Sequence, residues 1–329
     1  MLTDNFKRKI DYLRVSVTDR CDLRCTYCMA EDVTFLPRQE VLSIEEIIKL
    51  IDIFNELGVK KFRLTGGEPL VRKNIITIIE HLSELKKQNK IHEHTLTTNG
   101  TNLSKYAKIL KTNGVNRINV SLDSLDSEKY REVTKHGDLN KVINGIHAAS
   151  EEGIKVKINT VLTQNFNEEE VFDIINWCKI HSFDISLIEV MPIGAIGEKR
   201  FNQYLSMKKF EENLVSKLNL TPSNFKTNGP SRYFSDNTSS TKIGIISAIS
   251  HNFCDTCNRV RLTCTGKLYM CLGQNDYVDL KYSLRNLGKI DIIKQIEYAM
   301  TIKPQKHNFE ISKNNYEGYV NRHMNETGG

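Results

Sequence analysis

Residues 21–28 read Cys21-Asp22-Leu23-Arg24-Cys25-Thr26-Tyr27-Cys28 and directly follow a β-rich segment over 11–17. Three thiolates in one short loop can each bind one iron of a [4Fe–4S] cluster, which leaves the fourth iron open for a ligand that is not protein. A structural zinc site would need a fourth Cys or His nearby, and the next histidine is His81. The spacing therefore predicts an iron–sulfur loop at a strand end, and the alternative is a zinc site completed from a distant part of the chain.

Helical and β-rich segments alternate around this loop over about the first 200 residues. A helical stretch runs into a β-rich segment at Gly58, Gly114 and Gly153, because glycine readily takes the left-handed conformation that ends a helix. The capping-box pattern at 43–46 opens a helix that continues to about Leu57. Further helices are expected over 74–87, 105–112, 139–152, 168–181 and 291–300. Further strands are expected over 59–65, 115–122, 154–162 and 184–189, and another is expected to end at the polar residues 97–99.

About six strand–helix units indicate a parallel sheet with right-handed crossovers. Such units could form a doubly wound open sheet or a partial barrel, since a full barrel typically needs eight. The polar stretch 221–240 is typical of linkers and loops, and 242–272 has the pattern of β-hairpins. We therefore expect an α/β fold, with the strand–helix units in residues 1–220 and a smaller α+β region in residues 221–329.

A second group of four cysteines lies near the C-terminus, at Cys254, Cys257, Cys264 and Cys271. The residues alone are equally compatible with a closed zinc ribbon and with an iron–sulfur site. Arg259 and Arg261 lie between these cysteines and should project from one face of a strand. Their planar forks suit phosphate or purine edges, and the alternative is two surface arginines. Cys178, beside Trp177 in a predicted helix, is expected to pack in the core.

Composition and charge exclude several classes of protein. The chain has 329 residues with 46 Lys and Arg against 40 Asp and Glu, a net charge of +6, and it has no run of like charge that would indicate nucleic-acid binding. From residue 221 onward there are 14 basic against 9 acidic residues, which favours a small anionic ligand. No apolar run approaches a membrane span, and the charged N-terminus does not resemble a secretion signal. We therefore expect a cytoplasmic protein whose clustered cysteines bind metal and do not form disulfides.

Residues 21–28, with Tyr27 before the last cysteine, resemble the signature of the radical SAM enzymes. The stretch Thr65-Gly66-Gly67-Glu68-Pro69 is similar to the GGEP element of that superfamily. The resemblance implies a partial (β/α)6 barrel in which S-adenosylmethionine binds the open iron. It also implies that an electron from the reduced cluster cleaves this cofactor to methionine and a 5′-deoxyadenosyl radical.

The likeness extends over nearly the whole chain to the GTP 3′,8-cyclase family of molybdenum-cofactor biosynthesis. It rests on both cysteine groups, on the stretches 13–21, 63–70, 97–100 and 117–123, and on the final Gly-Gly. The resemblance implies a lyase that uses two [4Fe–4S] clusters. The radical would remove the 3′ hydrogen of GTP, and C3′ would bond to C8 to give (8S)-3′,8-cyclo-7,8-dihydroguanosine 5′-triphosphate. The implied partners are GTP, an electron donor and the downstream enzyme that makes cyclic pyranopterin monophosphate, and a homodimer is compatible with the pattern.

The same resemblance assigns roles residue by residue. The first cluster would be held by Cys21, Cys25 and Cys28, and the second, whose open iron would bind guanine, by Cys254, Cys257 and Cys271. S-adenosylmethionine would contact Tyr27, Gly67, Ser121 and Met191. GTP would contact Arg14, Arg63, Thr97, Lys157, Arg259 and Arg261, and the residues expected to serve catalysis are Arg259, Arg261, Gly328 and Gly329. The chain departs from the family at Ser186, where arginine is usual, at Thr327, where isoleucine is frequent, and at Cys264, which has no counterpart among the ligands.

Two other functions remain to be distinguished from this one. Radical SAM maturases that modify peptides also carry C-terminal auxiliary clusters, but they usually have more C-terminal cysteines than the four found here. An electron-transfer or zinc-ribbon module without catalysis is the second alternative, and both the GGEP stretch and the open three-cysteine loop argue against it.

Overall fold

The computed structural model describes residues 1–194, 202–227, 229–309, 320 and 322–328. Its described strands form one twelve-stranded sheet in the order β12-β11-β10-β1-β2-β3-β4-β5-β6-β9-β8-β7. The six middle strands are parallel and follow the chain order, as a partial barrel of six units requires. They are β1 (Tyr12–Ser16), β2 (Lys61–Thr65), β3 (Glu93–Thr98), β4 (Arg117–Ser121), β5 (Lys155–Leu162) and β6 (Asp184–Glu189).

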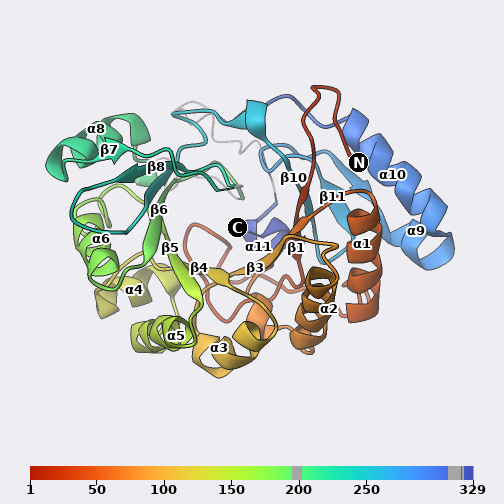
Figure 1. The fold of residues 1–329 in the computed structure, drawn as a ribbon, viewed down its shortest axis with the longest axis horizontal. Coiled ribbons are helices and arrows are strands. Elements are labelled where there is room, and N and C mark those ends of the chain that lie inside the picture. The colour runs from red at the N-terminus through yellow and green to blue at the C-terminus, as the bar shows by residue number, and fades with distance from the viewer. Residues whose placement is uncertain (195–201, 228, 310–319, 321, 329) are drawn as a thin grey trace.

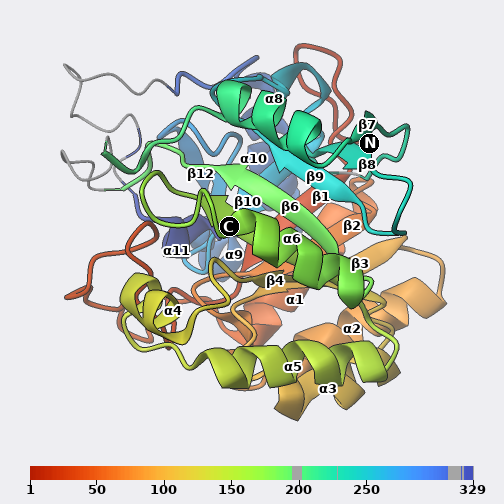
Figure 2. The ribbon, with the colours of Figure 1, turned by 90° about the vertical axis from the view of Figure 1, so that its left-hand side faces the viewer.

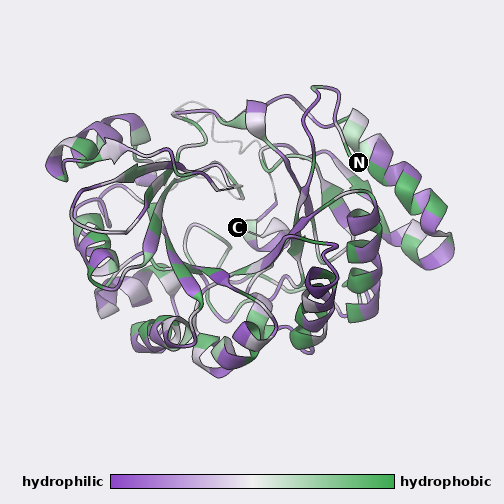
Figure 3. Ribbon diagram, viewed as in Figure 1, coloured by the Kyte–Doolittle hydropathy of each residue, from purple (hydrophilic) through white to green (hydrophobic). Residues whose placement is uncertain are grey.

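Helices cover the outer face of this curved sheet, and Figure 1 looks into the ring that the strands form. These helices are α1 (Ile44–Glu56), α2 (Ile75–Lys87), α3 (Leu103–Thr112), α4 (Ser127–Thr134), α5 (Leu139–Glu151) and α6 (Val171–Ile180). Each of these helices carries both apolar and polar residues, as Figure 3 shows and as amphipathic helices require. The predicted capping box of α1 is present, because Ser43 and Glu46 exchange hydrogen bonds with each other's backbone amides. The sequence did not predict α4.

Along each middle strand, the side chains point alternately to the hydrophobic core under the helices and to the inner face of the sheet. Leu13 and Val15 of β1 are fully buried among the core residues beneath the helices. Arg14 lies between them and faces the other side, because successive side chains of a strand point to opposite faces. The other middle strands repeat this pattern. The outer face of the sheet is therefore apolar, and the inner face carries the polar side chains.

The region after residue 220 extends the same sheet at both edges. On one side β9 (Ile243–Ile246) runs parallel to β6, followed by β8 (Arg232–Ser235) and β7 (Thr221–Pro222). On the other side β10 (Arg259–Leu262) runs parallel to β1, followed by β11 (Lys267–Tyr269) and β12 (Tyr277–Asp279). Figure 2 shows β9 beside β6 in the side view. The C-terminal region thus completes the wall of the partial barrel from both ends.

Two sequence-based expectations are corrected here. The stretch 221–240, expected to be linker and loops, contains β7 and β8. In 242–272 only β10 and β11 form the expected hairpin, since β9 pairs in parallel with a strand almost sixty residues earlier. Pairing with a distant strand leaves no local pattern in the sequence, which explains the error at β9. The strands β7 and β8 pair locally, but they are short and lie in a stretch whose polar composition is that of loops. The remaining elements are α8 (Met207–Lys217), α9 (Lys281–Asn286), α10 (Lys289–Thr301), α11 (Met324–Thr327) and the short turns η1 (Pro69–Val71) and η2 (Cys254–Thr256).

Among the helices formed by the described residues, none has the length and apolar character needed to cross a membrane.

Candidate active site

A single cavity follows the inner face of the sheet and brings the two cysteine groups together. Its lining includes all six expected ligands, the expected contacts of S-adenosylmethionine and the expected contacts of GTP. The first group follows the carboxyl end of β1. The second flanks the start of β10, which pairs in register with the start of β1 at Tyr12 and Arg259. The two cysteine groups therefore lie at opposite ends of the cavity.

All eight cysteines are thiols. Burial raises the pKa of Cys21 to about 12 and that of Cys25 well above its usual range. Such thiols stay protonated unless a metal ion takes the place of the proton, so the donor set fits metal binding. Within the described part of the chain, no three Cys, His, Asp or Glu side chains converge closely enough to share one metal ion. Ligands of a cubane bind separate irons and need not converge on one point.

Cys264 and Cys178 lie apart from these six thiols. Cys264 lies in the turn that connects β10 to β11, where it is buried, and it does not line the cavity. Its backbone carbonyl accepts a hydrogen bond of 2.7 Å from the amide of Leu42. Cys178, which lies in α6, packs in the hydrophobic core of the protein, as predicted.

The first cysteine loop is held by polar side chains that follow β3 and β4. Asn99 donates a 2.7 Å hydrogen bond to Asp22 and lies 3.8 Å from the Cys21 sulfur. Tyr27 donates a 2.6 Å hydrogen bond to Asp123, whose pKa burial raises to about 6. These contacts fix the direction in which the loop meets the cavity.

Gly67 allows a close approach between this loop and the end of β2. A Cβ atom at this position would overlap the carbonyl oxygen of Arg20. The neighbouring Glu68 accepts hydrogen bonds from Thr98 at 2.8 Å and from the Asn99 amide at 2.6 Å, and burial raises its pKa to about 7. The GGEP stretch therefore joins the ends of three strands.

Four arginines form a cationic group on the cavity wall. Arg14 is in register with Arg63 on one side and with Arg261 on the other, and Arg259 lies beside Tyr12. Within the described part of the chain none of them pairs with a carboxylate, and the Nε atoms of Arg14, Arg63 and Arg259 have no hydrogen-bond partner. Burial and mutual repulsion lower the pKa of Arg14 to about 10 and that of Arg261 well below its usual value. An anion would satisfy both the charge and the open donors.

Thr97 and Lys157 continue this surface along β3 and β5. The Arg63 guanidinium lies 3.4 Å from the Thr97 hydroxyl. Lys157 donates a 2.6 Å hydrogen bond to Tyr233, and burial lowers the pKa of this lysine. Ser186, where the family usually has arginine, is fully buried and its hydroxyl lies 3.1 Å from that of Ser231.

The C-terminal tail lies between the two cysteine loops. Arg322 donates to the carbonyl oxygens of Cys271 and Leu272 at 3.2 and 2.5 Å, and the Met324 amide donates to that of Cys28 at 3.2 Å. Gly328 has φ of 72°, and a Cβ atom there would overlap Thr65. Gly329, the other expected catalytic tail residue, lies outside the described residues.

Sequence reasoning missed several buried groups around the second cysteine loop. Lys303 and Arg8 donate to its backbone, and Arg322 reaches it from the tail. Glu189, the last residue of β6, accepts from the amides of Ile249 and Ser250 at 2.7 and 3.0 Å. Each partner is distant in sequence, so no local motif could have revealed these contacts.

The comparisons with known proteins agree with this geometry. Residues 15–178 match the model of the radical SAM superfamily, and residues 183–309 match the model described as Molybdenum Cofactor Synthesis C. The fold and the cysteine loop thus define a radical SAM enzyme. The second model begins before residue 221, and a domain division at 220 stays a prediction.

Curated relatives identify the family more closely. The chain is 49% identical to the GTP 3′,8-cyclase of Brucella ovis over 329 residues, which is all of this chain and 96% of the relative. It is 48% identical to that of Mesorhizobium japonicum, with 100% and 99% covered. The chain belongs to the GTP 3′,8-cyclase family.

Solved structures share the fold at low sequence identity. Streptococcus suis SuiB bound to S-adenosylmethionine has a TM-score of 0.62 and 16% identity, and the match covers 83% of this chain and 64% of that one. SuiB bound to the precursor peptide SuiA has a TM-score of 0.65 and 17% identity, with 92% and 66% covered. These likenesses concern the fold alone.

Proposed function

We propose that this chain is a GTP 3′,8-cyclase that catalyses the first step of molybdenum-cofactor biosynthesis with two [4Fe–4S] clusters and S-adenosylmethionine. The observation that carries the proposal is the group of arginines that have no carboxylate partner among the described residues and lie in one cavity between two three-cysteine groups. When bound and reduced, the first cluster supplies the electron that cleaves S-adenosylmethionine to the 5′-deoxyadenosyl radical that takes the 3′ hydrogen of GTP.

At one end of the cavity, Cys21, Cys25 and Cys28 hold the first cluster. Tyr27, Gly67, Ser121 and Met191 line the adjacent wall and contact S-adenosylmethionine. The hydrogen bond from Tyr27 to Asp123 fixes the aromatic ring, and the absence of a side chain at Gly67 lets the backbone approach the cofactor. These residues bind and orient the cofactor, which is how a protein contributes to radical chemistry.

At the other end, Cys254, Cys257 and Cys271 hold the second cluster, whose open iron binds the guanine. The guanidinium groups of the four arginines, with Lys157 and Thr97, bind the anionic substrate. GTP carries several negative charges, and these groups supply positive charge and open donors, while Glu93, a carboxylate that also lines the cavity, is paired with Arg117. The cost of burying the arginines is thereby offset when the substrate binds.

Gly328 brings the tail to the arginine group, because its carbonyl oxygen accepts a hydrogen bond from Arg261. Glycine suits this place because Thr65 leaves no room for a Cβ atom at Gly328. The further partners of the proposal are a cytoplasmic electron donor and the downstream enzyme that forms cyclic pyranopterin monophosphate.

Anaerobic reconstitution tests the metal content and the radical chemistry together. We expect close to eight irons per chain, since each three-cysteine group holds one cubane. Replacing Cys21, Cys25 and Cys28 together with Ala should halve the iron and abolish 5′-deoxyadenosine formation, whereas Cys178→Ala should retain both. Zinc in place of iron, or cleavage of S-adenosylmethionine by the triple variant, would refute the proposal.

A further inference from the structure

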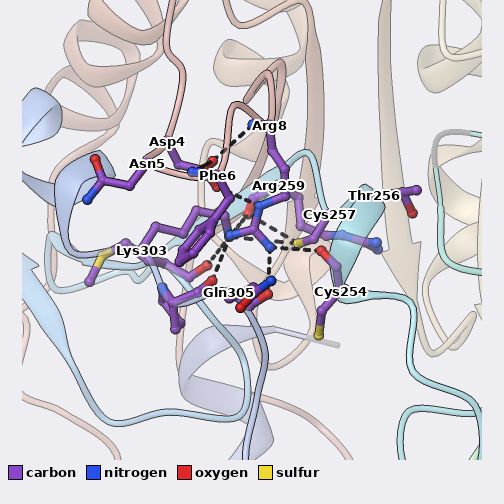
Figure 4. Close-up of polar contacts among 12 residues, drawn as sticks. Asp4, Asn5, Phe6, Arg8, Cys254, Thr256, Cys257, Arg259, Lys303 and Gln305 are labelled. Carbon is purple, nitrogen blue, oxygen red and sulfur yellow. Dashed lines mark hydrogen bonds and ion pairs between the residues drawn. The ribbon is translucent and has the colours of Figure 1, made fainter.

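Lys303 lies just beyond the end of α10, and its ammonium group reaches the second cysteine loop. The side chain is buried, with 3% of the residue exposed. Its Nζ atom donates hydrogen bonds to the carbonyl oxygens of Met270 at 2.6 Å and Arg259 at 3.1 Å, and to the sulfur of Cys257 at 3.7 Å. Figure 4 shows Lys303 beside Cys257. The ammonium group therefore contacts the backbone at the start of β10 and directly after β11, and it also contacts one thiol.

The charge of Lys303 has no carboxylate partner among the described residues. A buried cation is costly unless an opposite charge and hydrogen bonds compensate it. The two carbonyl oxygens supply dipoles only. Of its three acceptors, the Cys257 sulfur is the one that can carry a full negative charge, and it would do so as a metal ligand.

Arg8 provides a contrast in the same neighbourhood. Its guanidinium donates to the carbonyl oxygens of Cys254 at 2.8 Å and Pro304 at 2.6 Å, so it also holds this loop (Figure 4). Unlike Lys303, it pairs with a carboxylate, because its Nε atom lies 2.6 Å from Asp4. The charge of Arg8 is therefore offset within the protein, while that of Lys303 is directed at the thiol.

We propose that Lys303 is a positioning residue of the second [4Fe–4S] cluster, which holds the Cys257 thiolate through an N–H···S hydrogen bond and makes the cluster easier to reduce. The inference rests on the proposed function, since it requires a cluster on Cys254, Cys257 and Cys271. An oxidised cluster on three thiolates already carries net negative charge, and one electron from a reductant such as dithionite adds to it. A fixed positive charge stabilises the reduced form more than the oxidised form.

The test measures the reduction potential of the second cluster in the full-length chain. Replacing Cys21, Cys25 and Cys28 with Ser leaves this cluster as the one source of the electron paramagnetic resonance signal during a redox titration. In that parent, Lys303→Met should shift the midpoint potential to more negative values, and Lys303→Arg should restore much of the shift. The double variant Asp4→Asn/Arg8→Gln is the matched control, since it removes both members of a buried ion pair and leaves the local net charge unchanged, and it should leave the midpoint near the value of the parent.

Each outcome discriminates. A parent without iron would refute the second cluster and hence that part of the proposed function. A parent that binds iron, with an unchanged midpoint in Lys303→Met, would overturn the role of Lys303 alone. Equal shifts in Lys303→Met and in the double variant Asp4→Asn/Arg8→Gln would also overturn it, because they would reflect general loosening of the loop. Loss of iron from Lys303→Met but not from Asp4→Asn/Arg8→Gln would support the role in holding Cys257, and loss from both would contradict it.

Discussion

The guanidinium of Arg261 donates a hydrogen bond to the carbonyl oxygen of Gly328, so the C-terminal tail is joined to the arginine group of the cavity. Arg261 lies on β10 and is 6% exposed. The same side chain is thus available both to the tail and to an anionic substrate. This contact couples the position of the tail to the occupancy of the cavity.

Arg259 tests the substrate-binding surface without this direct contact to the tail. We expect Arg259→Ala to weaken GTP binding roughly ten- to a hundred-fold, since a lost hydrogen bond to a charged group costs about 1.5–3 kcal/mol. Anaerobic calorimetry measures the affinity, and iron analysis should show both clusters intact. Arg285→Ala is the matched control, because Arg285 pairs with Glu46 on the surface. Equal affinity in the Arg259 variant and the wild type would contradict the assignment.

Gly328 tests the tail itself. We expect Gly328→Ala, and deletion of residues 328–329, to suppress formation of the cyclised product while iron content and melting temperature stay near wild type. The added Cβ atom would overlap Thr65 and displace the tail. Gly288→Ala is the control, since no atom lies within 4 Å of a Cβ placed there. Full product formation by the truncated chain would mean that the tail is dispensable.

Cys264 tests the choice of ligands in the second group. It is buried off the cavity, whereas Cys271 lines it. Cys264→Ser should therefore keep close to the wild-type iron content, and Cys271→Ser should lose the second cluster. Iron and sulfide assays after reconstitution measure both, and the reverse result would mean that the two cysteines had been exchanged in the assignment.

The buried side chain of His94 should make the free energy of unfolding depend on pH. It is 1% exposed beneath the helices, and burial, aided by Lys86, lowers its pKa from 6.5 to about 4. Below about pH 6.5 the unfolded chain binds a proton that the folded chain does not take up until about pH 4. The free energy of unfolding should therefore fall as the pH is lowered through this window, by up to about 3 kcal/mol.

Urea unfolding of the apoprotein at pH 7 and pH 5 measures this effect. His94→Gln keeps a donor for the Asn113 carbonyl, which His94 contacts at 2.9 Å, and it should reduce the difference between the two pH values. The exposed neighbour His92 serves as the control, and His92→Gln should behave as the wild type. An unchanged pH dependence in His94→Gln would exclude this histidine as its source.

Local signals made the six strand–helix units predictable. The capping box at Ser43 and the glycines after the helices mark where α1 begins and where strands follow. The cysteine loop, the GGEP stretch and the paired arginines were also readable, because each is a short pattern with a chemical reason. The structure then brings these residues, which are up to about 250 positions apart, to one cavity.

What remained hidden depends on contacts between distant segments. The strand β9 pairs with β6, and the tail contacts β10, although neither segment has a local sequence pattern that indicates its partner. Lys303 and Arg8 look like ordinary surface cations in the sequence. They acquire a role only because the fold buries them against the second cysteine loop.

Transfer of hydrogen from the ribose of GTP tests the central claim most directly. The protein would be incubated anaerobically with S-adenosylmethionine, dithionite and GTP deuterated at C3′, and the products analysed by mass spectrometry. We predict deuterium in 5′-deoxyadenosine. The nucleotide product loses that deuterium and gains one electron and one proton, so with unlabelled substrate it is an isomer of GTP. Formation of 5′-deoxyadenosine without deuterium, together with unchanged GTP, would contradict the account.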